Sequence, residues 1–260
     1  MQLESKVIIV TGSAGGIGRC IAQTCVRQGA NVLITDRNAD GAHQVADELG
    51  DAAAAHVDEL SEASAPARIV AAAINAFGRL DGLVNNAAYV PRSDVKSTDA
   101  GLFDRVMHVN VRAPMLLIQA ALPHLSEAKG CVLNIGSVNA YCGEPPLLAY
   151  SISKGALMTM SRNLGDALFG SYGVRVNQIN PGWVLTDNEF KLKLADGLPP
   201  DWPSRIPRTV APSGGLITPE TIAAAAAFWL SDDSRPISGA VVDLEQYPMI
   251  GRNPPKEVVP

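Results

Sequence analysis

The chain has 260 residues, of which 47% are hydrophobic and only 5% aromatic, so we expect a single α/β domain over residues 1–260 with an aliphatic core. Its net charge of −5 argues against nucleic acid as a partner. No run reaches the roughly 18 consecutive apolar residues of a membrane helix, and Met1–Ser5 carries no signal peptide. We therefore expect no membrane partner and a cytoplasmic location.

Strands and helices alternate along the chain, the pattern of a parallel sheet wound on both faces. Ser61 is a candidate N-cap for a helix that ends near Phe77. A long helix ends near Gly170 or Gly173, and the last helix begins around Pro219. The apolar runs predict a doubly wound α/β fold with seven parallel strands, at 6–10, 31–35, 53–57, 80–85, 131–136, 174–179 and 240–244.

A glycine-rich turn joins the first predicted strand to a helix. Glycines allow a tight turn and close approach of a pyrophosphate, and the helix N-terminus offers free N–H groups and a positive dipole end. Because glycines also mark plain loops, the turn alone is weak evidence for a dinucleotide. Its candidate cofactor-binding residues are Gly12, Ser13, Gly15, Gly16, Ile17 and Gly18.

Asp36 ends the second predicted strand, about 20 residues after the glycine turn. A carboxylate there accepts hydrogen bonds from the adenosine ribose and repels the 2′-phosphate of NADP. Arg37 follows and offers a charge for a phosphate, but the turn itself holds no basic residue. We therefore predict NAD as the cofactor. The alternative is that Asp36 is an ordinary turn residue.

Tyr150 and Lys154 are four residues apart, which places both side chains on one helix face. A neighbouring ammonium favours the phenolate, so we expect a tyrosine pKa below its usual value of about 10. Such a group is suited to general acid/base work. Ser137 follows an apolar run, so its hydroxyl is expected at the carboxyl end of a buried strand. An isolated Tyr-x-x-x-Lys is more often a surface pair, so the assignment depends on the rest of the chain.

Together these motifs resemble the short-chain dehydrogenase/reductase family in its form of about 250 residues. The resemblance covers residues 5–245 and implies a Rossmann fold with a nicotinamide cofactor. The matching pieces, in family order, are Thr11-Gly12-x-x-x-Gly16-x-Gly18, Asn85-Asn86-Ala87, Asn110, Ser137, Tyr150-x-x-x-Lys154 and Asn180-Pro181-Gly182.

The resemblance also implies the catalytic roles. Tyr150 is the general acid/base, and Lys154 holds the nicotinamide ribose and lowers the tyrosine pKa. Ser137 orients the substrate oxygen, and Asn110 helps to hold a water that relays protons. Further cofactor contacts implied in this way are Asp58 at the adenine, Asn86 and Ala87 near the nicotinamide ribose, and Pro181, Gly182, Val184 and Thr186 at the carboxamide or phosphates.

The substrate end is less defined. Residues 187–217 hold several prolines and glycines and no predicted strand, so we expect a long loop that serves as a substrate lid, with a solvated surface excursion as the alternative. A polar lining favours a sugar, sugar acid or polyol over a long acyl chain or steroid. The candidate substrate residues are Arg92, Ser137, Asn139, Glu144, Trp183 and Asn188.

The chain departs from the family near its end, where Glu245-Gln246-Tyr247 stands in place of an Asp-Gly-Gly run. The proline-rich tail at 246–260 cannot extend the sheet. In related proteins such a tail often crosses a subunit interface, so the resemblance implies a homotetramer. The scattered cysteines and histidines show no metal-type spacing, so no metal is expected.

The sequence thus predicts an NAD-dependent oxidoreductase that transfers hydride between a small-molecule secondary alcohol, or sugar hemiacetal, and NAD. An oxoacyl-type or other keto reductase is the alternative within the enzymes, and Asp36 argues against its use of NADPH. A non-catalytic NAD-binding regulator is the alternative outside them. The complete set of Asn110, Ser137, Tyr150 and Lys154 argues against that reading.

Overall fold

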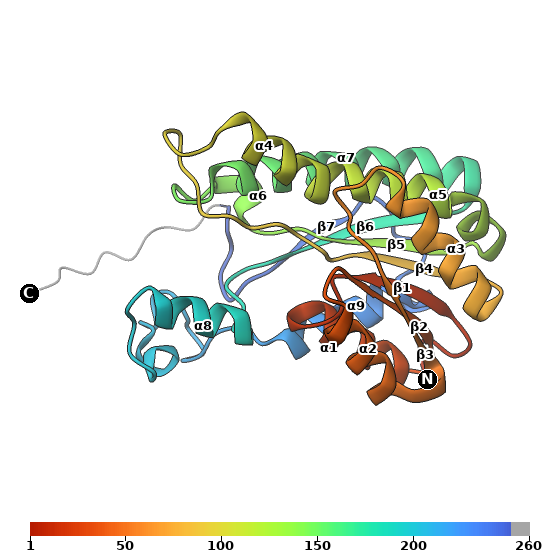
Figure 1. The fold of residues 1–260 in the computed structure, drawn as a ribbon, viewed down its shortest axis with the longest axis horizontal. Coiled ribbons are helices and arrows are strands. Elements are labelled where there is room, and N and C mark those ends of the chain that lie inside the picture. Colours follow the sequence, from red (N-terminus) through yellow and green to blue (C-terminus); the bar gives the residue numbers. More distant parts are fainter. Residues whose placement is uncertain (251–260) are drawn as a thin grey trace, which may run out of the picture.

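The computed structural model describes residues 1–250, and its centre is one parallel sheet of seven strands (Figure 1). The strand order is β3-β2-β1-β4-β5-β6-β7, so the direction of winding reverses between β1 and β4. The doubly wound fold and the positions of all seven predicted strands are confirmed. The strands are β1 (Val7–Thr11), β2 (Asn31–Asp36), β3 (Ala53–Val57), β4 (Gly82–Asn85), β5 (Cys131–Ile135), β6 (Arg175–Pro181) and β7 (Val241–Leu244).

Helices cover both faces of the sheet (Figure 1). One face carries α1 (Gly16–Arg27), α2 (Ala39–Leu49) and α9 (Pro219–Leu230). The other carries α3 (Ala65–Phe77), α5 (Ala113–Ala128) and α7 (Leu148–Tyr172). Shorter helices, α4 (Ala100–Met107), α6 (Asn139–Cys142) and α8 (Asp187–Ala195), lie between these elements in the chain.

Alternate residues of β1 pack into two separate apolar cores, as the two-residue repeat of a strand requires. Ile8 and Val10 join the core beneath α1, α2 and α9, whereas Val7 and Ile9 join the core beneath α3, α5 and α7. All four side chains are fully or almost fully buried. A strand covered on both faces therefore reads as an unbroken apolar run.

The predicted N-cap at Ser61 is wrong. Helix α3 begins at Ala65, and Ser64 occupies the capping position. Proline lacks an N–H and is tolerated only in the first helical turn, so a helix that contains Pro66 has to start close to it. The predicted end is confirmed, because Gly78 takes the left-handed conformation (φ 76°) just after Phe77.

The expectation of an irregular loop over 187–217 is also wrong in part, because α8 occupies its first nine residues. Thr186 caps this helix by accepting a hydrogen bond from the backbone N–H of Glu189 (3.1 Å). A threonine followed three residues later by a glutamate is a capping-box pattern. The sequence therefore carries a signal for the start of a helix at Thr186. The prolines and glycines further along favour a loop and hide that signal.

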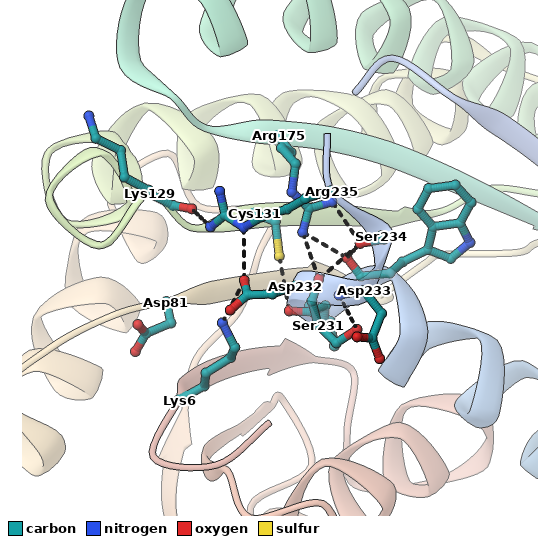
Figure 2. A network of polar contacts seen from close by, with 12 residues as sticks. Lys6, Asp81, Lys129, Cys131, Arg175, Ser231, Asp232, Asp233, Ser234 and Arg235 are labelled. Atoms are coloured by element: carbon teal, nitrogen blue, oxygen red, sulfur yellow. Dashed lines mark hydrogen bonds and ion pairs between the residues drawn. The ribbon is translucent and has the colours of Figure 1, made fainter. Parts of the chain in front are cut away.

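Arg175, the first residue of β6, is a buried cation that ties the sheet to α9 (Figure 2). It donates to the carbonyl oxygen of Ser231 (3.0 Å), the hydroxyl of Ser234 (2.8 Å) and the carbonyl oxygen of Trp229 (3.3 Å). Unpaired carbonyl groups and the negative dipole end at a helix C-terminus attract a cation. Arg175 therefore stabilises the end of α9, at the opposite end of the sheet from the strands' carboxyl ends.

We expect Arg175→Leu to reduce the free energy of unfolding by about 3 kcal/mol, because it leaves buried carbonyl and hydroxyl groups without a partner. Urea unfolding measures this change. Arg205→Leu is the control, since the Arg205 side chain is 64% exposed and, among residues 1–250, forms an ion pair with Asp201 alone. Its loss of stability should stay below about 0.5 kcal/mol. Equal losses in the two variants would contradict this role for Arg175.

Candidate active site

The glycine turn approaches the end of β4 too closely for side chains. A Cβ at Gly12 would lie 2.8 Å from the Cα of Ala87, and a Cβ at Gly18 would lie 2.2 Å from the carbonyl oxygen of Gly12. Gly12 also has a positive φ of 66°. By contrast, a Cβ at Gly15 would meet nothing within 4 Å. The turn is therefore closed on its inner side and open at the N-terminus of α1.

Side chains brace this turn from beneath. The amide nitrogen of Asn86 donates to the carbonyl oxygens of Thr11 (2.9 Å) and Gly12 (3.1 Å). The hydroxyl of Ser13 donates to the carbonyl of Val10 (2.7 Å) and accepts from the N–H of Thr35 (3.1 Å). Ser13 is fully buried and does not line the cavity described next. The Ser13 side chain therefore braces the turn, and its contact with a cofactor stays a prediction.

A cavity of about 560 Å³ opens in front of the turn, at the carboxyl ends of β1, β2, β3 and β4. Parallel α/β sheets bind ligands at this edge, where the strand order reverses. The predicted cofactor residues that line the cavity are Gly12, Gly15, Gly16, Ile17, Asp36, Arg37, Asp58, Asn86, Ala87 and Thr186. Gly18 lies behind it and contributes close packing instead.

Two carboxylates stand at the end of this cavity formed by β2 and β3. Asp36 accepts hydrogen bonds from the backbone N–H groups of Ala14 (3.1 Å) and Asn38 (3.0 Å). Asp58 is held by the guanidinium of Arg68 (2.6 and 2.9 Å) and the ring of His56 (3.1 Å). Burial pushes the pKa of Asp58 upward, but these hydrogen bonds outweigh it and lower the pKa. Asp58 is therefore an ionised acceptor whose position is fixed by its neighbours.

The cavity fits the end of a dinucleotide. It combines a side-chain-free turn, a helix N-terminus able to receive a pyrophosphate, and a carboxylate at the end of β2 able to receive ribose hydroxyls. Arg105 and Tyr89 also line it, with the guanidinium 4.9 Å from the centre of the ring. Neither residue is predicted from the sequence, because no motif includes them.

A second cavity of about 630 Å³ adjoins the first, and the two share the lining residues Ile17, Asn86, Ala88, Thr186 and Asn188. Ser137, Tyr150 and Lys154 line it together, and the Tyr150 hydroxyl is hydrogen-bonded to Ser137. The ammonium of Lys154 is buried, 5.5 Å from the centre of the Tyr150 ring, and donates to the carbonyl oxygen of Ile135 (2.7 Å). The structure therefore brings three of the four predicted catalytic side chains to one wall.

The expected low pKa of Tyr150 is not found. Burial raises the pKa of Tyr150 to about 12, the charge of Glu144 adds to the rise, and the hydrogen bond with Ser137 opposes it. Burial also lowers the pKa of Lys154 to about 8. Desolvation disfavours the charged form of both groups. It outweighs the attraction between ammonium and phenolate on which the expectation rested.

Asn110 lies beside the cavities but lines neither. Its side chain bonds the backbone N–H (2.7 Å) and carbonyl (3.0 Å) of Tyr89 and donates to the hydroxyl of Ser153 (2.9 Å). It sits in η2 (His108–Arg112), a π-helical turn between α4 and α5. Such turns are frequent at functional sites because they shift the backbone hydrogen bonds. Asn110 therefore holds the backbone here and leaves its side chain no free amide N–H for a ligand.

A ladder of buried amides runs beneath Ser137. Asn85, Asn134 and Gln178 stand opposite one another on β4, β5 and β6. The first two are joined directly (2.8 Å), and Ser161 of α7 links Asn134 to Gln178 (2.8 and 2.7 Å).

The ladder continues through Asn180 to β7. Asn180 accepts from Gln178 (2.7 Å) and from the backbone N–H of Ser137 (3.2 Å), and it donates to Asp243 (3.0 Å). The backbone of Ser137 is thus anchored to the sheet interior through side chains.

The segment 187–217 borders the second cavity through Asn188, Glu189, Leu192 and Lys193. At its base, Val184 and Ile217 form a parallel bridge. The ring of Trp183 stacks on the buried Trp202 with centroids 5.7 Å apart, and its indole N–H donates to Glu189 (2.8 Å). The segment is therefore a compact unit with an aromatic core of its own.

Every predicted substrate residue lines the second cavity: Arg92, Ser137, Asn139, Glu144, Trp183 and Asn188. Val184, Pro181 and Gly182 line it as well. Lys193, Glu245, Tyr247 and Met249 also line it and were not predicted as site residues. The departure from the family run at Glu245 was a usable signal. The predicted tail over 246–260 lies outside the described residues from position 251 onward.

Residues 1–250 contain no group of three or more His, Cys, Asp or Glu side chains placed to hold a metal ion. In the same part of the chain, no helix has both the length and the apolar character needed to cross a bilayer.

We expect Lys154→Met to raise the free energy of unfolding by about 2 kcal/mol near neutral pH, because it removes a buried charge. Below pH 8 Lys154 is protonated in both states, so the folded chain bears the full desolvation cost. Between pH 8 and 10.5 the unfolded chain keeps a proton that the folded chain releases, so the wild type gains stability as pH rises.

The difference in the free energy of unfolding between Lys154→Met and the wild type should therefore decrease from about pH 7 to about pH 9.5, as measured by urea unfolding. Lys191→Met, on the exposed surface of α8, controls for the loss of a lysine. A constant difference across this range would contradict the lowered pKa of Lys154.

Comparison with known proteins agrees with this geometry. A family model described as "Enoyl-(Acyl carrier protein) reductase" matches residues 12–245. The chain is 35% identical to 2-(S)-hydroxypropyl-CoM dehydrogenase 3 of Xanthobacter autotrophicus over 92% of this chain and 94% of that one. It is also 35% identical to L-fucose dehydrogenase of Rattus norvegicus, over 89% and 85% respectively.

Among solved structures, 3-ketoacyl-(acyl-carrier-protein) reductase from Brucella melitensis, complexed with NADH, superposes with a TM-score of 0.83. The two chains are 32% identical, and the match covers 93% of this chain and 97% of that one. With the strand order, the glycine turn and the wall of Ser137, Tyr150 and Lys154, these matches show that the chain belongs to the short-chain dehydrogenase/reductase family of oxidoreductases.

Proposed function

We propose that this protein is an NAD-dependent dehydrogenase of a secondary alcohol or sugar hemiacetal, with a sugar, sugar acid or polyol as substrate. The observation that carries the proposal is the Tyr150 hydroxyl bonded to Ser137, with a buried ammonium behind it, at the junction of the two cavities. A proton acceptor and a hydroxyl donor at one point are what an alcohol oxidation needs from the protein.

In this proposal the chain's own residues handle the proton and the substrate oxygen. Tyr150 takes the proton of the substrate hydroxyl, and Ser137 donates a hydrogen bond to the developing oxyanion. A bound nicotinamide supplies the hydride acceptor and, when oxidised, a positive charge that favours the phenolate. Lys154 adds a second positive charge, and its bond to the Ile135 carbonyl keeps it in place.

The cofactor residues follow from the first cavity. The turn residues Gly12, Gly15 and Gly16 with Ile17 would receive the pyrophosphate, Asp36 the ribose and Asp58 the adenine, while Thr186 lies where both cavities meet. Asp36 supports NAD over NADP, because a carboxylate repels the 2′-phosphate. The NADH named for the Brucella structure supports the same nicotinamide class.

The substrate class rests on the lining of the second cavity. Asn139, Glu144 and Glu189 place polar groups around Tyr150, which suits hydroxyl recognition better than a long acyl chain. The similarity to a fucose dehydrogenase supports a sugar as the substrate. The similarity to a ketoacyl reductase supports the alternative, a keto reductase. The lid role of 187–217, the homotetramer and the cytoplasmic location stay predictions.

We expect Tyr150→Phe to reduce kcat by about 10²- to 10⁴-fold, the usual contribution of a general acid/base. NADH binding, followed by fluorescence titration, should change little, because the variant keeps the ring and the cavity. Absorbance of reduced nicotinamide measures turnover with a panel of aldoses and polyols. Turnover that survives in this variant would remove the proposed mechanism, and absence of turnover in the wild type with every substrate and both cofactors would favour a regulator.

The cofactor preference has its own test. We expect wild-type kcat/KM to be at least about tenfold higher with NAD than with NADP, equivalent to about 1.4 kcal/mol. Asp36→Ser should narrow this ratio, because it removes the charge facing the 2′-phosphate. Asp40→Ser, four residues further on at the exposed start of α2, is the matched control. An equal preference in wild type and Asp36→Ser would count against the ribose contact.

A further inference from the structure

We propose that the substrate pocket selects uncharged polyhydroxy alcohols and rejects their carboxylate counterparts, because Glu144 and Glu245 line it and neither forms an ion pair with a cation among residues 1–250. This inference rests on the proposed dehydrogenase function and narrows its substrate class. It follows from the way the charged side chains of the second cavity are paired.

Glu245 follows the last strand and lies against the end of β6. Its two carboxylate oxygens accept the backbone N–H groups of Trp183 (3.1 Å) and Gln246 (2.7 Å). A Cβ at Gly182 would lie 1.8 Å from one of these oxygens, so the carboxylate rests directly on that glycine. Among residues 1–250 it forms no ion pair. Its charge is therefore fixed in place but not neutralised.

Glu144 lines the same cavity, in the connection that leads into α7. The side-chain amide of Asn139 donates to it at 3.4 Å, and no cation of the described chain pairs with it. Its charge is felt at the reacting hydroxyl, since after burial it is the second cause that raises the pKa of Tyr150. A carboxylate on the substrate would meet the same repulsion.

Arg92 and Lys193 also line the cavity, nearer its outer rim. Both already pair with carboxylates, either within α8 or directly after it. Arg92 makes two bonds to Asp196 (2.6 and 3.1 Å). Lys193 lies 3.7 Å from Glu189 and 3.9 Å from Asp196. The third cation of the cavity, Lys154, is buried and already donates to the carbonyl oxygen of Ile135. An acidic substrate would therefore have to break one of the outer pairs or remain unpaired beside Glu144 and Glu245.

A neutral polyol meets no such cost. Its hydroxyl groups are donors, and ionised carboxylates accept only, so Glu144 and Glu245 offer charge-assisted hydrogen bonds. The same two groups that repel an acid therefore favour a substrate with several hydroxyls. The pocket distinguishes the two classes by charge rather than by size, because a sugar and its acid have nearly the same shape.

The test compares matched pairs with NAD and full-length enzyme, for example galactose with galacturonate and xylitol with xylonate, within a wider panel of aldoses and polyols paired with their acids. We expect kcat/KM to be at least about tenfold higher for the neutral member of every active pair. An acid that is oxidised as well as its neutral partner overturns the inference but leaves the proposed function standing. No turnover with any member overturns both.

Variants locate the source of the selectivity. Glu144→Gln and Glu245→Gln should each raise the acid-to-neutral ratio of kcat/KM by about three- to tenfold, and both together by more. Glu127→Gln, on the exposed surface of α5 and outside both cavities, is the control. Glu144 is exposed, so its variant tests the idea even if Glu245→Gln unfolds. An unchanged ratio in Glu144→Gln overturns the assignment.

Discussion

The site depends on how closely the ends of β1 and β4 approach each other. At Gly12 the backbone of the turn nearly touches that of Ala87, and Asn86 bonds the turn from the other strand. This contact closes the inner side of the turn and aims the N-terminus of α1 outward. A side chain at Gly12 or Gly18 would push the two strands apart. The crevice that receives a dinucleotide therefore follows from the absence of side chains as much as from any group present.

The site also illustrates a conflict between stability and chemistry. Lys154 and Tyr150 are buried at the expense of their charged forms, since burial lowers the pKa of one to about 8 and raises that of the other to about 12. Proteins commonly retain such groups where activity needs them, although better-packed apolar residues would be more stable. The bond from Lys154 to the carbonyl of Ile135 shows how the fold offsets part of this cost.

Most of the fold and much of the site were predictable because they follow from local patterns. The strands are unbroken apolar runs, and Tyr150 and Lys154 share a helix face by spacing alone. The features that the sequence did not predict depend on burial and on contacts between residues far apart in the chain. The sequence does not show that Ser13 turns inward to Thr35, or that desolvation outweighs the ammonium beside Tyr150. The pairing of Arg92 with Asp196 joins segments 104 residues apart, which no local pattern reveals.

The amide ladder beneath Ser137 has a consequence for how the strands align. Asn85, Asn134 and Gln178 meet only when β4, β5 and β6 pair in the observed alignment. A slip of one residue would turn an amide from its partners into an apolar layer, where an unpaired polar group costs about 1 to 3 kcal/mol. Apolar strands alone would tolerate several alignments. The buried amides therefore favour one alignment of the three strands. That alignment sets where the strands end, and so sets the geometry of the catalytic edge.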